Sequence, residues 1–499
     1  MGGDADQAGR GEETEKITVV IDSKSPSVPT SCCDEKFKLL KDAFNEHSDV
    51  THAPKIRRVP HMIKDREQLR YLEQHLKFPS NYEPRVIAVG PLHHFNPNLK
   101  PAEKLKYKLA KNFMDENGEK EIQEGYLKIK NQINDLTKYY ENDDEAIKLV
   151  SDKEEDLAWL FFVDGCAMLH YMKCFTDQEK YQEHMKTFNI NNHTLAFIHR
   201  DLLLLENQLP YEVLELLINS SKNASALREG IKEFIDQNMM TPIAPELNTP
   251  QQEGNINQNM KTPVAPEQTN QQQEDKPHHL LDLLRKRLLA PKRQQKASGF
   301  CKRLMDKYKI NQKKTKTPSF RNVKELQAAG IKLRPLGTQE SRLTDASFSR
   351  MFCIGKLELH PFAIDDSTAP KLLNLVAYEM CPDFKNELEI TSYVCFLDSL
   401  IDEPGDVKEL RDAGILKNAM GSDEEVARLF NEISTDLVPN PQVYTDVEQH
   451  IQDHCDNKLV IWIAQFLYEH FSTPWTFLAF LGAIIALALT FVQTWYAIP

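Results

Sequence analysis

The C-terminal end of this chain carries an apolar stretch that constrains the whole architecture. Positions Trp475 to Val492 are eighteen consecutive residues without a charge or a proline. As a helix they would be roughly 27 Å long, close to the roughly 30 Å hydrocarbon core of a bilayer. Trp475 and Trp495 stand near the two ends, where amphipathic rings favour the headgroup region. We therefore predict a transmembrane helix over residues 474–498, with membrane contact from Trp475 to Ile498.

The rest of the 499-residue chain has the composition of a globular body. Apolar residues make up 41% and charged residues 27% of the sequence, which excludes a protein that crosses the membrane many times. Only 18 glycines occur, and this disfavours folds that bind phosphates through glycine-rich turns. Amphipathic runs with helical spacing predict a mainly α, large multi-helix soluble body with one C-terminal transmembrane helix. At most a small strand pair is expected, within Phe352 to Ile364.

A tandem duplication indicates a linker in the middle of the chain. The segment DQNMMTPIAPELNTPQQE, from Asp236, returns as NQNMKTPVAPEQTNQQQE, from Asn257. Its Gln-, Asn- and Pro-rich composition cannot build a core. The expected organisation is a disordered tail (1–35), a first helical part (36–235), a low-complexity linker (236–318), a second helical part (319–460) and the membrane helix (474–498). Within the linker, His278 to Leu289 is predicted to form a helical island.

The linker also holds a strongly basic window. From Arg285 to Lys316 there are thirteen Lys or Arg residues against one acid, Asp306, although the chain as a whole has a net charge of −13. The simplest interpretation is a solvated, flexible segment. Three alternatives stay open: a surface for anionic lipid, a site for an acidic partner, or a nuclear localisation signal. The acidic remainder argues against nucleic acid as a partner.

Two apolar segments are predicted to lie in the core. Leu157 to Met172 is too short and too interrupted for a second membrane crossing, because Asp164 and Gly165 stand at its centre. We expect a buried helix with a bend or break at Gly165, and a structural hydrogen bond or ion pair at Asp164.

The second segment combines four leucines with a polar triplet. Leu202 to Leu205 must enter a core, Glu206, Asn207 and Gln208 interrupt it, and Pro210 begins a new helix. An acid followed by amides between two buried segments predicts a hydrogen-bond clamp at a helix corner.

Two further helix ends are marked by a local repeat. Lys324 to Ile331 (KELQAAGI) recurs as Lys408 to Ile415 (KELRDAGI), and in both an apolar residue follows a glycine. This pattern predicts C-terminal caps with left-handed Gly330 and Gly414.

The motifs of common enzyme classes are absent from the sequence. No phosphate-binding loop, dinucleotide fingerprint, nucleophile elbow or HExxH zinc motif occurs. The adjacent pairs His93-His94 and His278-His279 point to different sides of a helix or strand, which disfavours a shared metal. We therefore predict no catalytic, cofactor-binding or metal-binding residues and no enzymatic activity. If an unrecognised active site exists, Asp164, His170 and Glu206 are the first side chains to consider.

Orientation in the membrane is the least constrained property. Lys458 precedes the apolar stretch and no basic residue follows it, which favours a cytosolic body. Three glycosylation sequons, at Asn192, Asn219 and Asn223, would be used only if the body were lumenal or extracellular. The small residues Gly482 and Ala486 permit helix association and hence a homo-oligomer.

Several motifs taken together resemble the plant family called domain of unknown function 247. The motifs are IRRVP (56–60), YxP (82–84), GPLHH (90–94), VDGC (163–166), DLLLLENQLP (201–210), EL…GI (325–331), NLVAYE (374–379) and GSDEEVA (421–427). They occur in order over nearly the whole chain. The chain departs from the family pattern at Ala167, where a bulkier apolar residue is usual, and in its duplicated linker.

The resemblance implies a largely helical, single-pass membrane protein without an established activity, cofactor or catalytic residue. Some grass members are associated with self-incompatibility loci and are proposed to act in pollen recognition. We therefore expect a membrane-tethered, non-enzymatic protein of recognition or signalling, in the plasma membrane, with a protein partner. A hydrolytic or transfer enzyme and a lipid-binding membrane scaffold stay open as alternatives.

Overall fold

The computed structural model describes most of the chain from residue 55 onward. The described residues are 55–64, 81–141, 145–151, 153–174, 176, 187, 190–240, 276–290, 322–337, 342–351, 354–384, 387–457, 462 and 474–497. The expected disordered tail (1–35), nearly all of the duplicated repeat and the basic residues 292–316 lie outside them. The described residues all belong to one compact unit.

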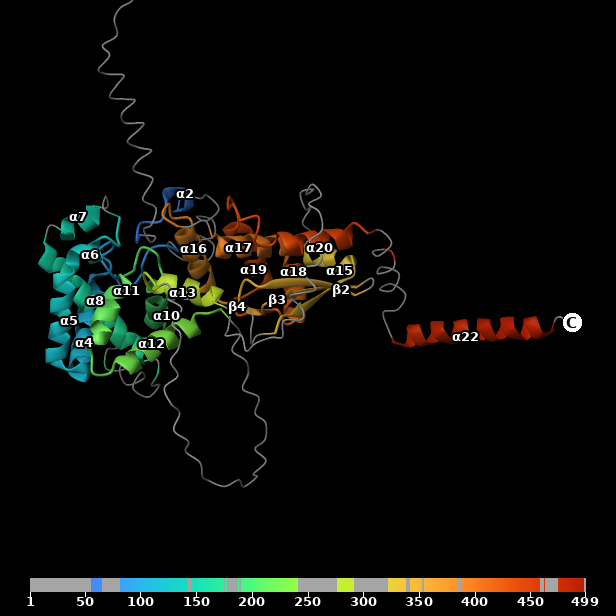
Figure 1. The fold of residues 1–499 in the computed structure, drawn as a ribbon, viewed down its shortest axis with the longest axis horizontal. Helices are drawn as coiled ribbons and strands as arrows, with labels where there is room; N and C mark the ends of the chain where they lie inside the picture. The colour runs from blue at the N-terminus through green and yellow to red at the C-terminus, as the bar shows by residue number, and fades with distance from the viewer. Residues whose placement is uncertain are drawn as a thin grey trace, which may run out of the picture. The chain divides into compact units, whose positions relative to one another are not determined.

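A long buried helix organises the first helical part. The helices here are α4 (Lys100–Asn117), α5 (Glu119–Asn131), α8 (Glu154–Cys174), α11 (Tyr211–Asn219) and α12 (Ala224–Gln237). Helix α8 packs against the other four, and Figure 1 shows α4, α5 and α8 side by side. Nearly all of its side chains from Leu157 to Met172 are buried, so the prediction of a core helix is confirmed.

The sequence predicts a bend or a break at Gly165, and the helix is not broken there. Helix α8 runs through this position without interruption. A Cβ atom at Gly165 would lie 2.7 Å from Leu217 Cδ1 and 3.2 Å from Val213 Cγ1. The glycine therefore serves the close approach of α11 to α8, and it does not end the helix.

Short helices complete this part. They are α2 (His61–Lys64), α6 (Ile133–Thr137), α7 (Glu145–Ser151) and α10 (Asn192–Asp201). The segment that precedes α2 is extended, with a bridge between Ile56 and Tyr140. The segment from Asn81 to Pro91 contains neither helix nor strand.

The second helical part surrounds two small sheets. Its helices are α15 (Val323–Ala328), α16 (Thr368–Glu379), α17 (Glu389–Leu400), α18 (Pro404–Asp412), α19 (Asp423–Ile433) and α20 (Thr445–Cys455). The strands are β1 (Ile331–Pro335), β2 (Ala346–Met351), β3 (Ile354–Leu359), β4 (Phe362–Ile364) and β5 (Leu416–Asn418). The mainly α class is thus confirmed.

The strand content exceeds the single pair that the sequence predicts. Strands β3 and β4 both lie within the expected region, but they do not pair with each other. Strand β3 lies between parallel β1 and antiparallel β2, and β4 pairs in parallel with β5. Parallel partners come from distant parts of the sequence, so local alternation alone could not reveal them.

The helical island is a buried part of the body. Helix α13 (Leu280–Leu289) lies between α12 and α16, and its leucines Leu281, Leu284 and Leu288 are almost fully buried (Figure 1). Two backbone hydrogen bonds, from Ala363 N to Met240 O and from Tyr211 N to His278 O, hold the described residues on either side of positions 241–275, and each is 2.7 Å long. Residues 276–290 of the expected linker thus pack with both helical parts.

The two predicted helix caps are confirmed. Gly330 and Gly414 have φ angles of 82° and 74°. After α18, Gly414 N donates to Arg411 O and Ile415 N donates to Leu410 O, which is the hydrogen-bond pattern of a Schellman cap.

The C-terminal helix is α22 (Pro474–Ala497). Its segment Leu478–Tyr496 is long and apolar enough to cross a membrane, with a mean hydropathy of 1.9, and none of it is buried against the body. This agrees with the span predicted from the sequence.

Candidate functional site

The chain turns sharply between α10 and α11, and four polar side chains fill this turn. We call Asp201, Glu206, Asn207 and Gln208 the polar corner. All four are at most 1% exposed. The leucines Leu202 to Leu205 between them are also buried, so the polar groups must find partners inside the protein.

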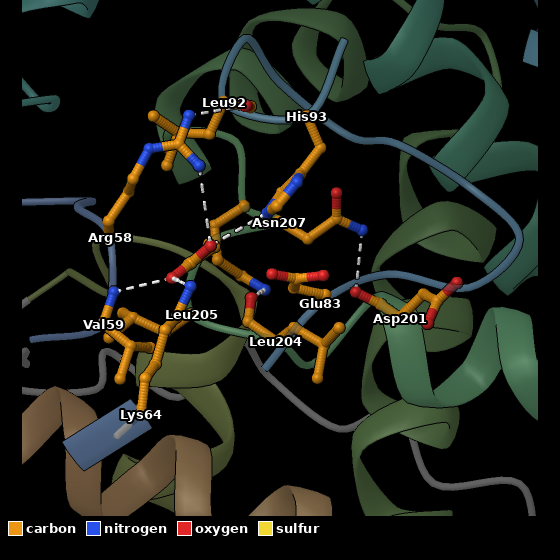
Figure 2. Close-up of polar contacts among 12 residues, drawn as sticks. Arg58, Val59, Lys64, Glu83, Leu92, His93, Asp201, Leu204, Leu205 and Asn207 are labelled. Carbon is orange, nitrogen blue, oxygen red and sulfur yellow. Dashed lines mark hydrogen bonds and ion pairs between the residues drawn. The ribbon is translucent and has the colours of Figure 1, made fainter. Parts of the chain in front are cut away.

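Glu206 is the residue of the polar corner that several basic side chains surround. Its Oε1 accepts a hydrogen bond from Val59 N at 2.8 Å and lies 2.5 Å from Lys64 Nζ. Its Oε2 lies 3.0 Å from His93 Nε2 and 3.8 Å from Arg58 Nη1. Figure 2 shows Arg58, Val59, Lys64 and His93 converging from different sides.

The surroundings of Glu206 keep the carboxylate ionised. Burial alone raises the pKa of Glu206, but the hydrogen bond from His93 and the positive charge of Lys64 outweigh burial, so its pKa lies below the ordinary value. A general acid needs a pKa near the working pH. The geometry instead suits a permanent anion that ties segment 58–64 to the α10–α11 turn.

Asn207 and Asp201 bind the backbone of residues 85–89, a segment that belongs to neither a helix nor a strand. Asn207 Oδ1 accepts from Val89 N at 2.7 Å, and its Nδ2 donates to Ile87 O at 3.0 Å and to Asp201 O at 2.9 Å (Figure 2). Asp201 Oδ2 accepts from three successive backbone N–H groups, those of residues 85–87. Side chains thus satisfy backbone groups that a sheet would otherwise satisfy.

Gln208 joins the α10–α11 turn to α13 and lies against the backbone at Gly90. Its Nε2 donates to the carbonyls of Leu202 and Leu204, and its Oε1 accepts from Leu281 N at 3.1 Å. A Cβ atom at Gly90, where φ is +70°, would lie 2.6 Å from the Gln208 carbonyl oxygen. Only glycine fits such a close backbone approach.

A second buried ion pair joins Lys106 on α4 to Asp164 on α8. Lys106 Nζ donates to Ala88 O at 3.0 Å and contacts Asp164 Oδ1 at 2.6 Å and Glu103 Oε1 at 2.7 Å, so all three of its protons have an acceptor. Burial lowers the pKa of Lys106, but the carboxylates of Asp164 and Glu103 together raise it by more than burial lowers it. The pKa of Lys106 therefore lies above the ordinary value. Asp164 Oδ2 accepts from Gly90 N at 2.9 Å. The predicted structural pairing of Asp164 is confirmed.

A small cavity lies beside this ion pair. It has a volume of about 10 Å³ and is lined by Lys106, Asp164 and mainly apolar residues of α4, α8 and α10. Such a volume accommodates about one water molecule. It is far too small for an organic substrate.

Buried polar contacts also join the two helical parts. Asn374 on α16 accepts from Leu205 N at 2.9 Å and donates to Asn81 O at 2.9 Å. Arg285 on α13 donates to Glu379 Oε1 at 2.8 Å, and Glu379 also accepts from the backbone N of Thr391. Because Arg285 is buried in this pair, it is not part of an exposed lipid surface, contrary to the range expected from the sequence.

The structure separates the three side chains considered for an unrecognised active site. Asp164 pairs with Lys106, His170 faces Glu116 at 3.8 Å, and Glu206 lies in the polar corner. No described contact joins any two of the three. Among the described residues, no group of three or more His, Cys, Asp or Glu side chains could hold a metal ion.

The adjacent histidines have separate structural partners. His93 contacts Glu206, and His279 Nδ1 accepts from Asp282 N at 3.1 Å as the N-cap of α13.

Sequence reasoning did not single out Lys106, Asp201, Asn374 or Arg285. A signal for two of them exists in the helical spacing. Lys106 follows the buried face of α4, and Arg285 falls on the leucine face of α13. A basic residue on an apolar helix face indicates a buried partner.

The fold and its buried polar contacts define a mainly helical protein, and one helix within its described residues is suited to crossing a membrane. The chain belongs to the plant family DUF247, described as plant protein of unknown function, which matches residues 69–489. This confirms the resemblance found in the sequence.

Two Arabidopsis thaliana relatives are similar over most of their length. UPF0481 protein At3g47200 is 27% identical over 434 residues, which cover 84% of this chain and 83% of the relative. Putative UPF0481 protein At3g02645 is 21% identical over 490 residues, which cover 83% of this chain and 87% of the relative. No solved structure matches the chain.

Proposed function

We propose that this protein is a membrane-tethered, non-enzymatic component of recognition or signalling, in which α22 anchors the helical body and the body's surface binds a protein partner. The plasma membrane is the proposed location. Pollen recognition of the self-incompatibility type is the form of this function that the family resemblance implies. A homo-oligomer through Gly482 and Ala486 of α22 is part of the proposal.

One observation carries the non-enzymatic part of this proposal. The buried charged groups Lys106, Asp164, Glu206 and Glu379 each bond to backbone or side-chain groups of distant segments. Their hydrogen-bonding capacity is used to join these segments, and the cavity beside Asp164 has room for only about one water molecule. Buried polar groups of this kind specify a fold, whereas an active site needs polar groups that converge on a space for substrate.

The membrane part is supported by α22. Its apolar segment has the length of a bilayer core, and its large side chains, among them Leu487 and Phe491, are exposed along the helix. A water-exposed helix of this composition would be strongly unfavourable, because each buried methylene is worth about 0.8 kcal/mol. Insertion into a bilayer removes this cost.

The first experiment is glycosidase-shift and protease-protection mapping of the full-length protein in plant microsomes. The structure shows which sequons are accessible. Asn192 and Asn219 are exposed, whereas Asn223 is half-buried and its Nδ2 donates to Glu116 O. A protected, glycosylated body would face outward and favour cell-to-cell recognition; an unglycosylated, protease-sensitive body would face the cytosol and favour a signalling adaptor.

Matched variants complete this experiment. Asn192→Gln and Asn219→Gln should each remove one glycan shift if the body is lumenal, and Asn223→Gln should change nothing. Release of the protein from membranes by alkaline carbonate would contradict the membrane anchor. Turnover of a substrate by the purified chain would contradict the non-enzymatic part.

A further inference from the structure

The exposed side of α4 combines lysines with a tyrosine. Lys100, Lys104, Tyr107, Lys108 and Lys111 are all exposed, and their spacing places them on one side of the helix. We call these five residues the α4 face. Its opposite side carries Lys106 and Leu109, which point into the protein beside the small cavity.

Neighbouring helices extend the aromatic part of the α4 face. Trp159 on α8 is 44% exposed and Tyr107 is 50% exposed. Trp159 Nε1 donates to Tyr107 Oη at 3.2 Å, and the Trp159 ring meets Tyr126 of α5 edge-on with centroids 5.6 Å apart. These contacts hold an exposed tryptophan in place although its ring is not buried, which is typical of a contact surface.

The charges of the α4 face are only partly neutralised. Lys111 pairs with Asp115, but Lys100, Lys104 and Lys108 have no acidic partner among the contacts of the described residues. Two of the acids nearby have other partners. Glu103 binds the buried Lys106, and Glu155 at the start of α8 binds Lys130. The face is therefore net positive.

We propose that the α4 face is a contact surface for the anionic headgroups of the bilayer into which α22 inserts; this rests on the membrane attachment proposed above. Tryptophan, tyrosine and lysine are the side chains that favour the interface between membrane and water. Each lysine near an anionic leaflet strengthens contact by about fivefold. A body already tethered by α22 needs only such weak forces to lie against the bilayer.

The test uses the full-length chain in bilayers with brominated acyl chains. Trp462→Phe, Trp475→Phe and Trp495→Phe leave Trp159 as the sole tryptophan. Its fluorescence should be quenched in membranes that contain phosphatidylserine and much less in pure phosphatidylcholine. Equal absence of quenching in both membranes would overturn the proposal.

The lysines are tested in the same background. Lys100→Gln, Lys104→Gln and Lys108→Gln together should weaken the contact on the order of 100-fold and abolish the quenching. Unchanged quenching would overturn the role of the α4 face. A melting temperature close to that of the parent chain verifies that the variant is folded.

A control with the same charge change uses Lys332→Gln, Lys408→Gln and Lys417→Gln, three exposed lysines of the second helical part. This variant should keep the quenching of Trp159. Equal loss in both variants would contradict a specific role of α4.

Two further readouts separate the alternatives. A chain with Trp495 as its sole tryptophan reports the insertion of α22. Quenching at Trp495 without quenching at Trp159 would support membrane insertion of α22 and reject the α4 contact. The absence of quenching at both positions would reject membrane insertion of α22 itself. Shielding of Trp159 only after addition of an acidic protein would assign the face to a protein partner and overturn the membrane contact.

Discussion

Glu206 illustrates how a single buried charge connects distant segments. Its carboxylate binds Val59 N, Lys64 and His93, which belong to two segments more than 100 residues away in sequence. Without it, Val59 N and His93 would be left in a nearly water-free environment, whereas Lys64 is 21% exposed. Removing one member of such a group costs more than the pair itself contributes, because the remaining charges stay buried.

Replacing Glu206 should therefore be strongly destabilising. Glu206→Ala should lower the free energy of unfolding by about 3–5 kcal/mol, measured by urea denaturation of the full chain in detergent. Glu206→Gln should cost less, because an amide oxygen can still accept from Val59 N. Glu154→Ala, an exposed position on α8, is the control and should change little. Equal stability of all three variants would show that the polar corner is not structural.

His279 should make the stability depend on pH. Burial lowers its pKa to about 4, with the nearby Asp282 carboxylate opposing this shift, against an ordinary value of about 6.5. The folded protein favours the neutral imidazole, because its pKa in the folded state is depressed. The folding free energy is therefore unaffected by protonation of His279 above about pH 6.5, and stability is lost as the pH falls from there toward about 4. The loss should approach about 3 kcal/mol.

The measurement compares urea midpoints between pH 4 and pH 7. His279→Asn keeps an acceptor for Asp282 N at the N-cap and should have a flatter curve than the parent chain. His199, whose pKa is also lowered to about 4 by burial, leaves the variant with a residual slope. Parallel curves would rule out the contribution of His279.

At the scale of elements, helices approach each other closely where glycines permit it. On α12, a Cβ atom at Gly230 would lie 2.8 Å from Lys173 Cα and 2.9 Å from Lys173 N. These are backbone atoms of α8, so they cannot rotate away as a side chain could. The packing of α12 on α8 thus depends on the absence of one side chain.

Gly230→Ala should destabilise the protein although alanine favours helices. Helix propensity alone would stabilise by about 1 kcal/mol, whereas overpacking should cost about 1–3 kcal/mol. Gly405→Ala on α18 is the control, because its Cβ would meet only the flexible end of the Lys324 side chain. A more stable Gly230→Ala variant would show that α12 can move away from α8 at little cost.

At the scale of the whole molecule, α13 unites the two helical parts. Its backbone binds Gln208 of the first part, and its Arg285 binds Glu379 of the second. Asn374 adds a second connection, to Leu205. Because of these shared core contacts, we expect the body to unfold as one cooperative unit.

The first helical part should not fold by itself. A fragment of residues 53–240 lacks α13 and α16, and it would expose Leu205 and Gln208, which are buried in the full chain. We expect no cooperative thermal transition by circular dichroism. Adding residues 276–457 on a second chain should restore the transition. A cooperative transition of the first fragment alone would support the domain boundary expected from the sequence.

The sequence by itself determined the features that arise from local patterns. The apolar run of α22, the capping glycines Gly330 and Gly414 and the buried helix α8 follow from hydrophobic spacing and backbone preferences, which act over a few residues. The hydrogen-bonding role of Glu206 to Gln208 was also predictable, because polar groups between buried leucines must be satisfied.

Only the tertiary structure decided the partners of these groups. Lys64, His93 and Asn374 lie far from the α10–α11 turn in sequence, so no local pattern names them. The parallel pairings of β1 with β3 and of β4 with β5 likewise join separated segments. The assignment of α13 to the core depended on surfaces contributed by both helical parts, since burial is a property of the assembled chain and local composition describes only the segment itself.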